Sequence, residues 1–226
     1  MAEAASFLGG MRMIPGVRAG FTGRVEGVEP GFDKGEALGQ LEPAHREAVK
    51  RLGFEWEQLW RAEQVHGAEV AVVPSGGRER MAGGADGLVT GTPGVLLGIY
   101  VADCAAVFLA DRRHGALGLV HSGRKGTGLG IVGRALALMG AEFGTDAGEV
   151  VAAISPCIRP PLYEVDIAGM IREQLREAGV PDGQVTDCGI CTGAEVGRYY
   201  SYRVEKGKTG RMLALLGRVE GGADES

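Results

Sequence analysis

The sequence predicts an α+β fold contained in a single domain. Three apolar runs lie within residues 94–133, and runs of this length bounded by turn residues are typical of buried strands. Apolar residues recur at helical spacing in two later segments, 129–143 and 166–178. The β-α-β-α alternation of doubly wound folds is absent, and no Ser/Pro-rich linker divides the 226 residues. We therefore expect one domain over residues 1–226.

The composition excludes several classes of protein. Hydrophobic residues make up 45% of the chain and charged residues 23%, which favours a buried core over disorder. The formal net charge of −5 disfavours a nucleic-acid-binding surface. The longest apolar tract, 94–110, contains Asp103 and therefore fits buried strands better than a membrane helix. Four cysteines are too few for a disulfide scaffold, and the first residues lack the pattern of an export signal. We expect a cytoplasmic protein without a nucleic-acid or membrane partner.

Proline and turn residues predict the elements of the first half. Residues 11–21 are expected to form an edge strand, because the proline within them is tolerated only at a sheet edge. Residues 43–52 begin with a proline suited to a first helical turn and continue at helical spacing, which predicts a helix. Residues 64–73 start polar and become β-branched, which predicts a strand with His66 near its start.

The second half has clearer patterns. The helix over 129–143 is expected to end at Gly144, and the helix over 166–178 to be capped by Asp166. A hairpin turn with a solvent-facing His114 is expected between two of the apolar runs. Further expected elements are a turn leading into a short strand within 85–90, strands at 150–154 and 199–204, a short helix at 211–216, and flexible ends at 1–10 and 219–226.

Two short motifs carry little information. Residues 128–133 match the G-x-G-x-x-G pattern of dinucleotide sites, but the preceding strand ends near His121, too far upstream, so helix packing explains these glycines better. Cys188 and Cys191 form a C-x-x-C pair, which fits either a redox dithiol or half of a zinc site. The sequence supplies no further partner for either, apart from Cys157 if the fold brings it near.

His66, Cys104 and His121 form a more informative set, since each lies where a strand is expected to begin or end. Two imidazoles and one thiolate are ligands of catalytic zinc, whose fourth position stays open to water. Zinc lowers the pKa of that water to about 7, so hydroxide becomes available at neutral pH. The same residues also fit a metal-free alternative, in which Cys104 is a nucleophile and His121 its base.

Several segments resemble the bacterial laccase-domain proteins, which were called polyphenol oxidases and more recently purine nucleoside phosphorylases. The matching pieces run in order through most of the chain, and such a series is far more specific than any single piece. They are QVHGAEV around His66, ADGLVT at Asp86, VADCAAVFLAD around Cys104, VHSGRKGT around His121, SPCIRPPLYEVD around Cys157, and SYRVEKGKTGRM from Ser201.

The resemblance implies a mixed sandwich domain, with central β layers flanked by helices, and a set of functional residues. In the family, the positions of His66, Cys104 and His121 bind zinc; copper is the alternative metal, from the older family name. Arg24 lies where the family has an arginine in an N-terminal loop. With Lys125 it is the expected phosphate or ribose contact, because two cations beside a metal attract an anionic co-substrate.

The chain departs from the family pattern at two places near the expected site. Arg124 stands where the family usually has a tryptophan, which removes an aromatic surface on which a purine could stack. Arg159 stands where the family has a glycine and adds a side chain there. These departures suggest an altered choice of substrate.

The predicted function is a zinc-dependent purine nucleoside phosphorylase acting on adenosine- or inosine-like nucleosides and phosphate, with adenosine deamination as a further candidate activity. Cys104, His121 and Asp103 are the candidate catalytic residues, with Asp103 as proton carrier. A copper polyphenol oxidase is an alternative, although His45 and His114 would supply too few further ligands for a multicopper centre. A cysteine-dependent hydrolase or amidase and a zinc-stabilised interaction module are the others. The sequence does not predict the oligomeric state.

Overall fold

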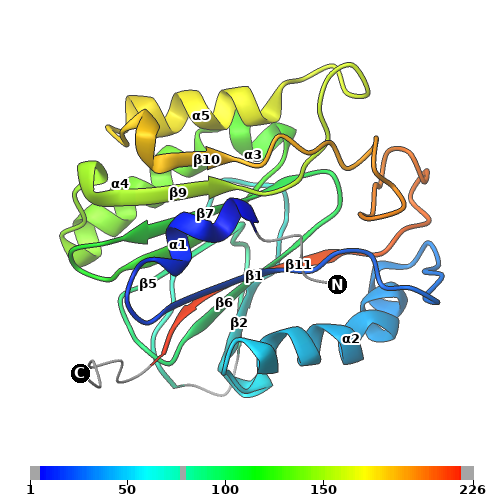
Figure 1. Cartoon of the computed structure of the whole chain (residues 1–226), viewed down its shortest axis with the longest axis horizontal. Coiled ribbons are helices and arrows are strands. Elements are labelled where there is room, and N and C mark those ends of the chain that lie inside the picture. The colour runs from blue at the N-terminus through cyan, green and yellow to red at the C-terminus, as the bar shows by residue number, and fades with distance from the viewer. Residues whose placement is uncertain (1–5, 77–79, 220–226) are drawn as a thin grey trace.

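The computed structural model describes residues 6–76 and 80–219, and two mixed β-sheets lie at its centre (Figure 1). The first sheet has the strand order β1-β11-β6-β2-β4, and the second has the order β10-β9-β7-β8-β5-β3. The first comprises β1 (Val17–Phe21), β11 (Met212–Arg218), β6 (Leu96–Val101), β2 (Leu59–Ala62) and β4 (Met81–Ala82). The second comprises β10 (Val185–Asp187), β9 (Val150–Ile154), β7 (Ala105–Asp111), β8 (Leu117–Ser122), β5 (Gly87–Thr90) and β3 (Val70–Val72).

Helices cover the outer face of each sheet (Figure 1). Helix α2 (Lys34–Arg51) packs on the first sheet, while α4 (Ile131–Phe143) and α5 (Ile167–Glu177) pack on the second. Shorter helices are α1 (Gly9–Arg12), α3 (Arg124–Gly128), η1 (Ser6–Leu8), η2 (Trp56–Gln58), η3 (Ala147–Glu149) and η4 (Asp182–Gln184). No helix in the described part of the chain combines the length and the apolar character that a membrane-spanning helix requires. The result is an α+β sandwich, as predicted.

The central strands are buried on both faces, which explains their continuous apolar sequences. In β7, Ala106 and Phe108 face the core between the two sheets, while Val107 and Leu109 face the core beneath α4 and α5. A strand covered on both sides needs no polar alternation, so it reads as an unbroken apolar run. This is why three such runs marked β6, β7 and β8, although β6 belongs to the other sheet.

Several element predictions are confirmed. β9 occupies the predicted 150–154, and β5 lies within the predicted 85–90. β1 lies at a sheet edge as predicted but covers only residues 17–21 of the predicted 11–21, because residues 9–12 are helical and the proline lies in the turn before the strand. Gly144 ends α4 at φ 68°, a left-handed conformation that glycine adopts without strain, and the Asp166 side chain accepts a hydrogen bond from Gly169 N at the start of α5. β7 and β8 form the predicted hairpin, with the half-exposed His114 paired to Asp111.

The N-terminal predictions need correction. Residues 1–5 and 220–226 lie outside the described residues, but residues 6–10, predicted to be flexible, belong to η1 and α1. Phe7 and Leu8 are buried there, so apolar contacts hold this segment. The helix predicted at 43–52 begins earlier, at Lys34. Asp33 caps its start, which places the proline inside the helix.

Two predicted C-terminal elements are wrong in type, and the strand predicted at 64–73 is too long. Residues 199–204 form turns and not a strand. Residues 211–216 are not helical, because their leucine-rich sequence pairs as β11 between β1 and β6, and this non-local pairing overrides helix propensity. The strand predicted at 64–73 is limited to β3, since Gln64 and His66 adopt positive φ angles that interrupt extended backbone.

The burial of Phe7 gives a test of the corrected N-terminus. Its ring packs edge to face against Phe21 at 5.9 Å and against Phe108 at 6.0 Å between centroids. Phe7→Ala should lower the free energy of unfolding by about 3–5 kcal/mol, as for other buried phenylalanines, in a urea titration. Met13→Ala, at a residue that is 83% exposed, should change it little. Equal stability of the two variants would show that this segment does not contribute to the core.

Candidate metal centre

His66, Cys104 and His121 come together at one end of the second sheet. One ligand atom from each lies within 4.8 Å of those of the other two, and the imidazole rings are 4.9 Å apart, nearly perpendicular at 82°. His66 comes from the segment before β3, Cys104 from the turn between β6 and β7, and His121 from β8. His66 is exposed, Cys104 half-buried and His121 buried, so the group opens to solvent on one side.

Asp86 organises this group, and the sequence analysis assigned it no role in the site. Its fully buried carboxylate accepts hydrogen bonds from His66 N at 2.9 Å, Gly67 N at 2.6 Å and His121 Nδ1 at 2.8 Å. Burial opposes ionisation, but the hydrogen bonds from His121 and the two amides outweigh it and lower the pKa of Asp86. The available signal was its position directly before β5, a strand that pairs with both β3 and β8.

The contact with Asp86 determines which nitrogen of His121 can bind a metal. Because the carboxylate accepts from Nδ1, Nε2 is the nitrogen left to bind a metal, on loss of its own proton. A metal-binding histidine that donates its other N–H to a carboxylate is a recurrent arrangement, since it fixes the ring and raises its basicity. Two imidazoles and one thiol with this support fit zinc that keeps one open position.

The metal-free electrostatics favour a deprotonated sulfur. Burial disfavours the thiolate, but hydrogen bonds from His121 and His66 outweigh it and lower the pKa of Cys104 to about 6. Burial also disfavours a charged His121, whereas its bonds to Asp86 and Cys104 raise the pKa of His121 to about 9. The thiolate is the form of cysteine that binds metals, so Cys104 is prepared as a ligand at neutral pH.

Two glycines after β8 are required by the close packing around Cys104. A Cβ atom at Gly123 would lie 2.6 Å from Cys104 Sγ, and one at Gly126 would lie 2.6 Å from the carbonyl oxygen of Gly67. Both distances are too short for any side chain. These two glycines therefore let α3 lie close to the group of His66, Cys104 and His121.

A cavity of about 1000 Å³ opens beside the metal-binding group. Its walls include all three candidate ligands together with Asp103 and Lys125. The remaining lining residues are Lys34, Gln64, Tyr100, Ala102, Arg124, Gly128, Leu129, Ile158, Tyr163, Ile167, Tyr202, Arg203, Lys206 and Arg211. The wall is therefore apolar and aromatic, with a surplus of cations.

Asp103 lines the cavity, but other residues engage both of its carboxylate oxygens. Oδ1 accepts a hydrogen bond from Thr192 Oγ1 and Oδ2 accepts one from Arg203 N, each at 2.7 Å. Its carbonyl oxygen accepts from Ile158 N at 2.8 Å. At φ 79°, Asp103 is held in a left-handed conformation beside Cys104. Its predicted role as proton carrier stays a prediction, whereas its contacts join three loops around the cavity.

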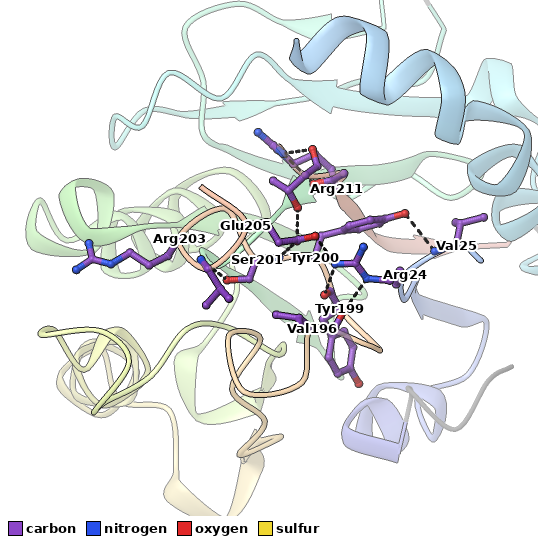
Figure 2. Close-up of polar contacts among 12 residues, drawn as sticks. Arg24, Val25, Val196, Tyr199, Tyr200, Ser201, Arg203, Glu205 and Arg211 are labelled. Carbon is purple, nitrogen blue, oxygen red and sulfur yellow. Dashed lines mark hydrogen bonds and ion pairs between the residues drawn. The ribbon is translucent and has the colours of Figure 1, made fainter. Parts of the chain in front are cut away.

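Arg24 does not line the cavity, in contrast to Lys125. Its guanidinium donates to the carbonyl oxygens of Val196 and Tyr199 and forms an ion pair with Glu205 at 2.7 Å (Figure 2). Arg24 therefore contacts protein groups, whereas the resemblance implied that it contacts phosphate or ribose.

The two departures from the family pattern have different surroundings. Arg124 lines the cavity and pairs with Glu164 at 2.9 Å on the exposed rim. Arg159 does not line the cavity and pairs with Asp187. The departure at Arg124 therefore changes the cavity wall, and that at Arg159 does not.

The fold does bring Cys157 beside the C-x-x-C pair, because Cys157 and Cys191 form an isolated parallel β-bridge. All four cysteines are free thiols. Burial raises the pKa of Cys157 to about 12, which makes it a poor nucleophile. Among the described residues, His66, Cys104 and His121 are the one group with metal-binding spacing, so the cysteine cluster does not form a second site.

Comparison with known proteins identifies the family. The sequence matches the family described as multi-copper polyphenol oxidoreductase laccase over residues 18–168 and 163–219. The chain is a divergent member of this laccase-domain family. Similar proteins named purine nucleoside phosphorylase come from Geobacillus stearothermophilus, 30% identical with 86% of this chain and 83% of the relative covered, and from Deinococcus radiodurans, 34% identical with 91% and 92% covered. The crystal structure of YlmD from G. stearothermophilus matches with a TM-score of 0.82 at 28% identity, over 92% of this chain and 93% of that one.

The multi-copper description does not fit the histidines of this laccase-domain chain. His45 is buried beside Tyr100 and His114 belongs to the β7–β8 hairpin, so neither joins the group at Cys104. The described residues thus offer a site for one ion. The relatives from G. stearothermophilus and D. radiodurans are both named purine nucleoside phosphorylases.

The support from Asp86 can be tested by its amide variant. Asp86→Asn keeps the shape but loses the charge that accepts three N–H groups, so zinc affinity should fall by about 10- to 100-fold. A competition titration against a chromophoric chelator measures it. Glu69→Gln, at a side chain that is 78% exposed, is the matched control. Equal zinc affinity of both variants would contradict a supporting role for Asp86.

His45, which is buried in α2, should make the stability of the protein depend on pH. Its Nε2 donates to the Arg211 carbonyl oxygen at 3.2 Å, its Nδ1 has no partner among the described residues, and burial lowers the pKa of His45 to about 4. Between about pH 6.5 and pH 4 the unfolded chain binds a proton that the folded protein does not, so stability should decrease as the pH falls.

The effect on the free energy of unfolding should reach about 3 kcal/mol, since each pKa unit corresponds to about 1.4 kcal/mol. His45→Gln removes the titrating group, and urea titrations at several pH values should therefore show a shallower pH dependence than in the wild type. Parallel curves for the two proteins would contradict this assignment.

Proposed function

We propose that the chain is a zinc-dependent purine nucleoside phosphorylase that cleaves adenosine- or inosine-like nucleosides with phosphate. The observation that carries this proposal is a single cavity with a metal-binding group in one wall and cations without acidic partners in another. The names of the relatives support the same class of reaction. An anion and a neutral nucleoside can both be accommodated, because about 1000 Å³ is at the upper end of the range for ligand pockets.

Lys34 and Arg211 form the best candidate site for phosphate. Both line the cavity; burial and the nearby positive charge of Arg211 lower the pKa of Lys34, and burial also lowers the pKa of Arg211. Neither forms an ion pair with an acidic side chain of residues 6–76 or 80–219. Two cations that line the same cavity and form no ion pair favour an anion between them. Lys206 and Lys125 add further positive charge to the cavity.

The rest of the wall suits a nucleoside. Tyr163, Tyr202, Leu129 and Ile158 provide apolar and aromatic surface against which a purine can pack. These side chains replace the stacking surface that is lost where Arg124 stands in place of tryptophan. The purine is therefore expected on this wall and the ribose between it and the cations.

Phosphorolysis makes and breaks two bonds at one carbon. A phosphate oxygen forms a bond to ribose C1′, and the bond from C1′ to the purine nitrogen breaks, with its electron pair leaving on the base, which then takes up a proton. Lys34 and Arg211 would hold the attacking phosphate. His66, Cys104 and His121 would hold zinc, which supplies Lewis acidity next to the substrate.

Deamination of adenosine is the weaker candidate for this site. It needs a proton carrier close to the candidate metal ligands, and Asp103 is the predicted one. Both carboxylate oxygens of Asp103 accept hydrogen bonds from protein groups, which favours a fixed acceptor over a carrier. Ammonia release from adenosine would decide in favour of this second activity.

The experiment combines metal analysis with product analysis. Purified protein should contain zinc and release hypoxanthine from inosine only when phosphate is present. Cys104→Ala should lose the metal and the activity. Copper together with oxidation of phenols would support the older family name, and turnover without any metal would support a cysteine-dependent hydrolase.

The phosphate site has its own test. Lys34→Gln should raise the KM for phosphate about ten-fold, the equivalent of about 1.4 kcal/mol of binding free energy, with little change in the KM for inosine. Lys50→Gln, at an exposed lysine near the other end of α2, is the control. An unchanged KM for phosphate in Lys34→Gln would place the anion elsewhere.

A further inference from the structure

Residues 199–211 form a loop that supplies much of the cationic wall of the cavity. Tyr202, Arg203, Lys206 and Arg211 all line the cavity, although none of them lies in a helix or strand. Irregular backbone of this length positions side chains accurately only when other contacts fix it. Contacts with other parts of the chain must therefore fix this loop.

Glu205 closes the loop at its base. Its Oε2 accepts hydrogen bonds from Ser201 N at 2.8 Å and from Thr209 Oγ1 at 2.6 Å, so one carboxylate joins the two ends of the turn. Its Oε1 accepts from Arg24 Nη2 at 2.7 Å. The Glu205 side chain is 22% exposed, so these charge-assisted bonds are partly shielded from water.

Arg24 connects this loop to the segment that follows β1. Its guanidinium stacks on the Tyr200 ring, 4.4 Å from the centroid, while Nε donates to the Val196 carbonyl oxygen at 2.6 Å. Figure 2 shows Arg24 directed toward Glu205 and the Tyr199–Tyr200 backbone, whereas the side chains of Arg203 and Arg211 point away from this cluster.

The packing around Tyr200 carries this support on to the cavity wall. A Cβ atom at Gly210 would lie 2.6 Å from the Tyr200 ring, so the same ring packs against Arg24 and against the backbone next to Arg211. The Tyr200 hydroxyl accepts a hydrogen bond from Val25 N at 3.2 Å. Neither Arg24 nor Tyr200 lines the cavity, so both support the loop without reaching the proposed anion.

We infer that Arg24 and Glu205 are positioning residues that hold the 199–211 loop, so that Lys206 and Arg211 face the anion in the cavity, and that Arg24 does not itself touch phosphate. This inference rests on the proposed function for the identity of the anion. Its structural part, the ordering of the loop by the Arg24–Glu205 pair, does not depend on any activity.

A comparison of Arg24→Gln, Glu205→Gln and the double variant separates positioning from contact. If Arg24 holds the loop through Glu205, the two single variants should have similar effects and the double variant should be no worse than either. If Arg24 contacts phosphate, only Arg24→Gln should weaken phosphate binding, because Glu205→Gln would leave the guanidinium in place. Glu195→Gln, which removes the exposed pair with Arg198, is the matched control.

Two measurements are needed. Hydrogen–deuterium exchange at the amides of residues 201–209 reports loop order without turnover, and calorimetric titration with inorganic phosphate reports the anion site. We expect faster exchange in this segment in both single variants, unchanged exchange in β7 and β8, and about ten-fold weaker phosphate binding, which corresponds to about 1.4 kcal/mol. Thr209→Val removes one of the Glu205 bonds and should give a smaller change in the same direction.

Other outcomes overturn the inference. Unchanged exchange at 201–209 in Glu205→Gln or Thr209→Val would show that this carboxylate does not order the loop. Weak phosphate binding in Arg24→Gln with wild-type binding in Glu205→Gln would make Arg24 a direct ligand. A wild-type protein that binds no phosphate would reject the proposed function, while the exchange measurements would still decide the positioning role.

Discussion

The buried carboxylate of Asp86 is the contact on which the candidate site depends. It accepts from His121 Nδ1 and from two backbone amides of the His66 segment, so both histidines are fixed by one side chain. An unpaired buried carboxylate would be costly, and here three donors offset its desolvation. Because β5 pairs with β3 and with β8, the sheet places Asp86 between the two histidine-bearing segments. The pairing of these strands therefore determines the geometry of the candidate metal site.

The remaining parts of the site come from turns around the two packed sheets. Cys104 lies in the turn that passes from β6 in the first sheet to β7 in the second, next to Asp103 with its positive φ. The glycines after β8 let this turn approach the sulfur closely. A chain that crosses between sheets at this point brings polar residues to the end of an otherwise apolar core, which is where a cavity can reach them.

Local signals explain which features could be predicted from the sequence. The strands β7 to β9 and the helices α4 and α5 are each marked by a contiguous pattern. His66, Cys104 and His121 are far apart in the sequence, but each lies at an expected strand end and in its own short motif. Asp86 and the pair Lys34 and Arg211 carry no such mark, because their partners are remote in the chain and only the fold brings them together. The sequence of residues 211–216 predicts a helix, although the segment forms β11. Its pairing with β1 and β6 could not be predicted, because both strands are remote in the sequence.

The distribution of carboxylates decides where the cavity keeps its positive charge. Glu205 pairs with Arg24 and Glu164 pairs with Arg124 and Arg203, so these three arginines have acidic partners. Lys34, Lys206 and Arg211 line the same cavity without an ion pair to the described residues, in a chain whose formal net charge is −5. Cations that have no ion-pair partner repel one another, and this repulsion is relieved when an anion binds. An acidic protein can thereby present one local site for phosphate while its remaining surface repels other polyanions.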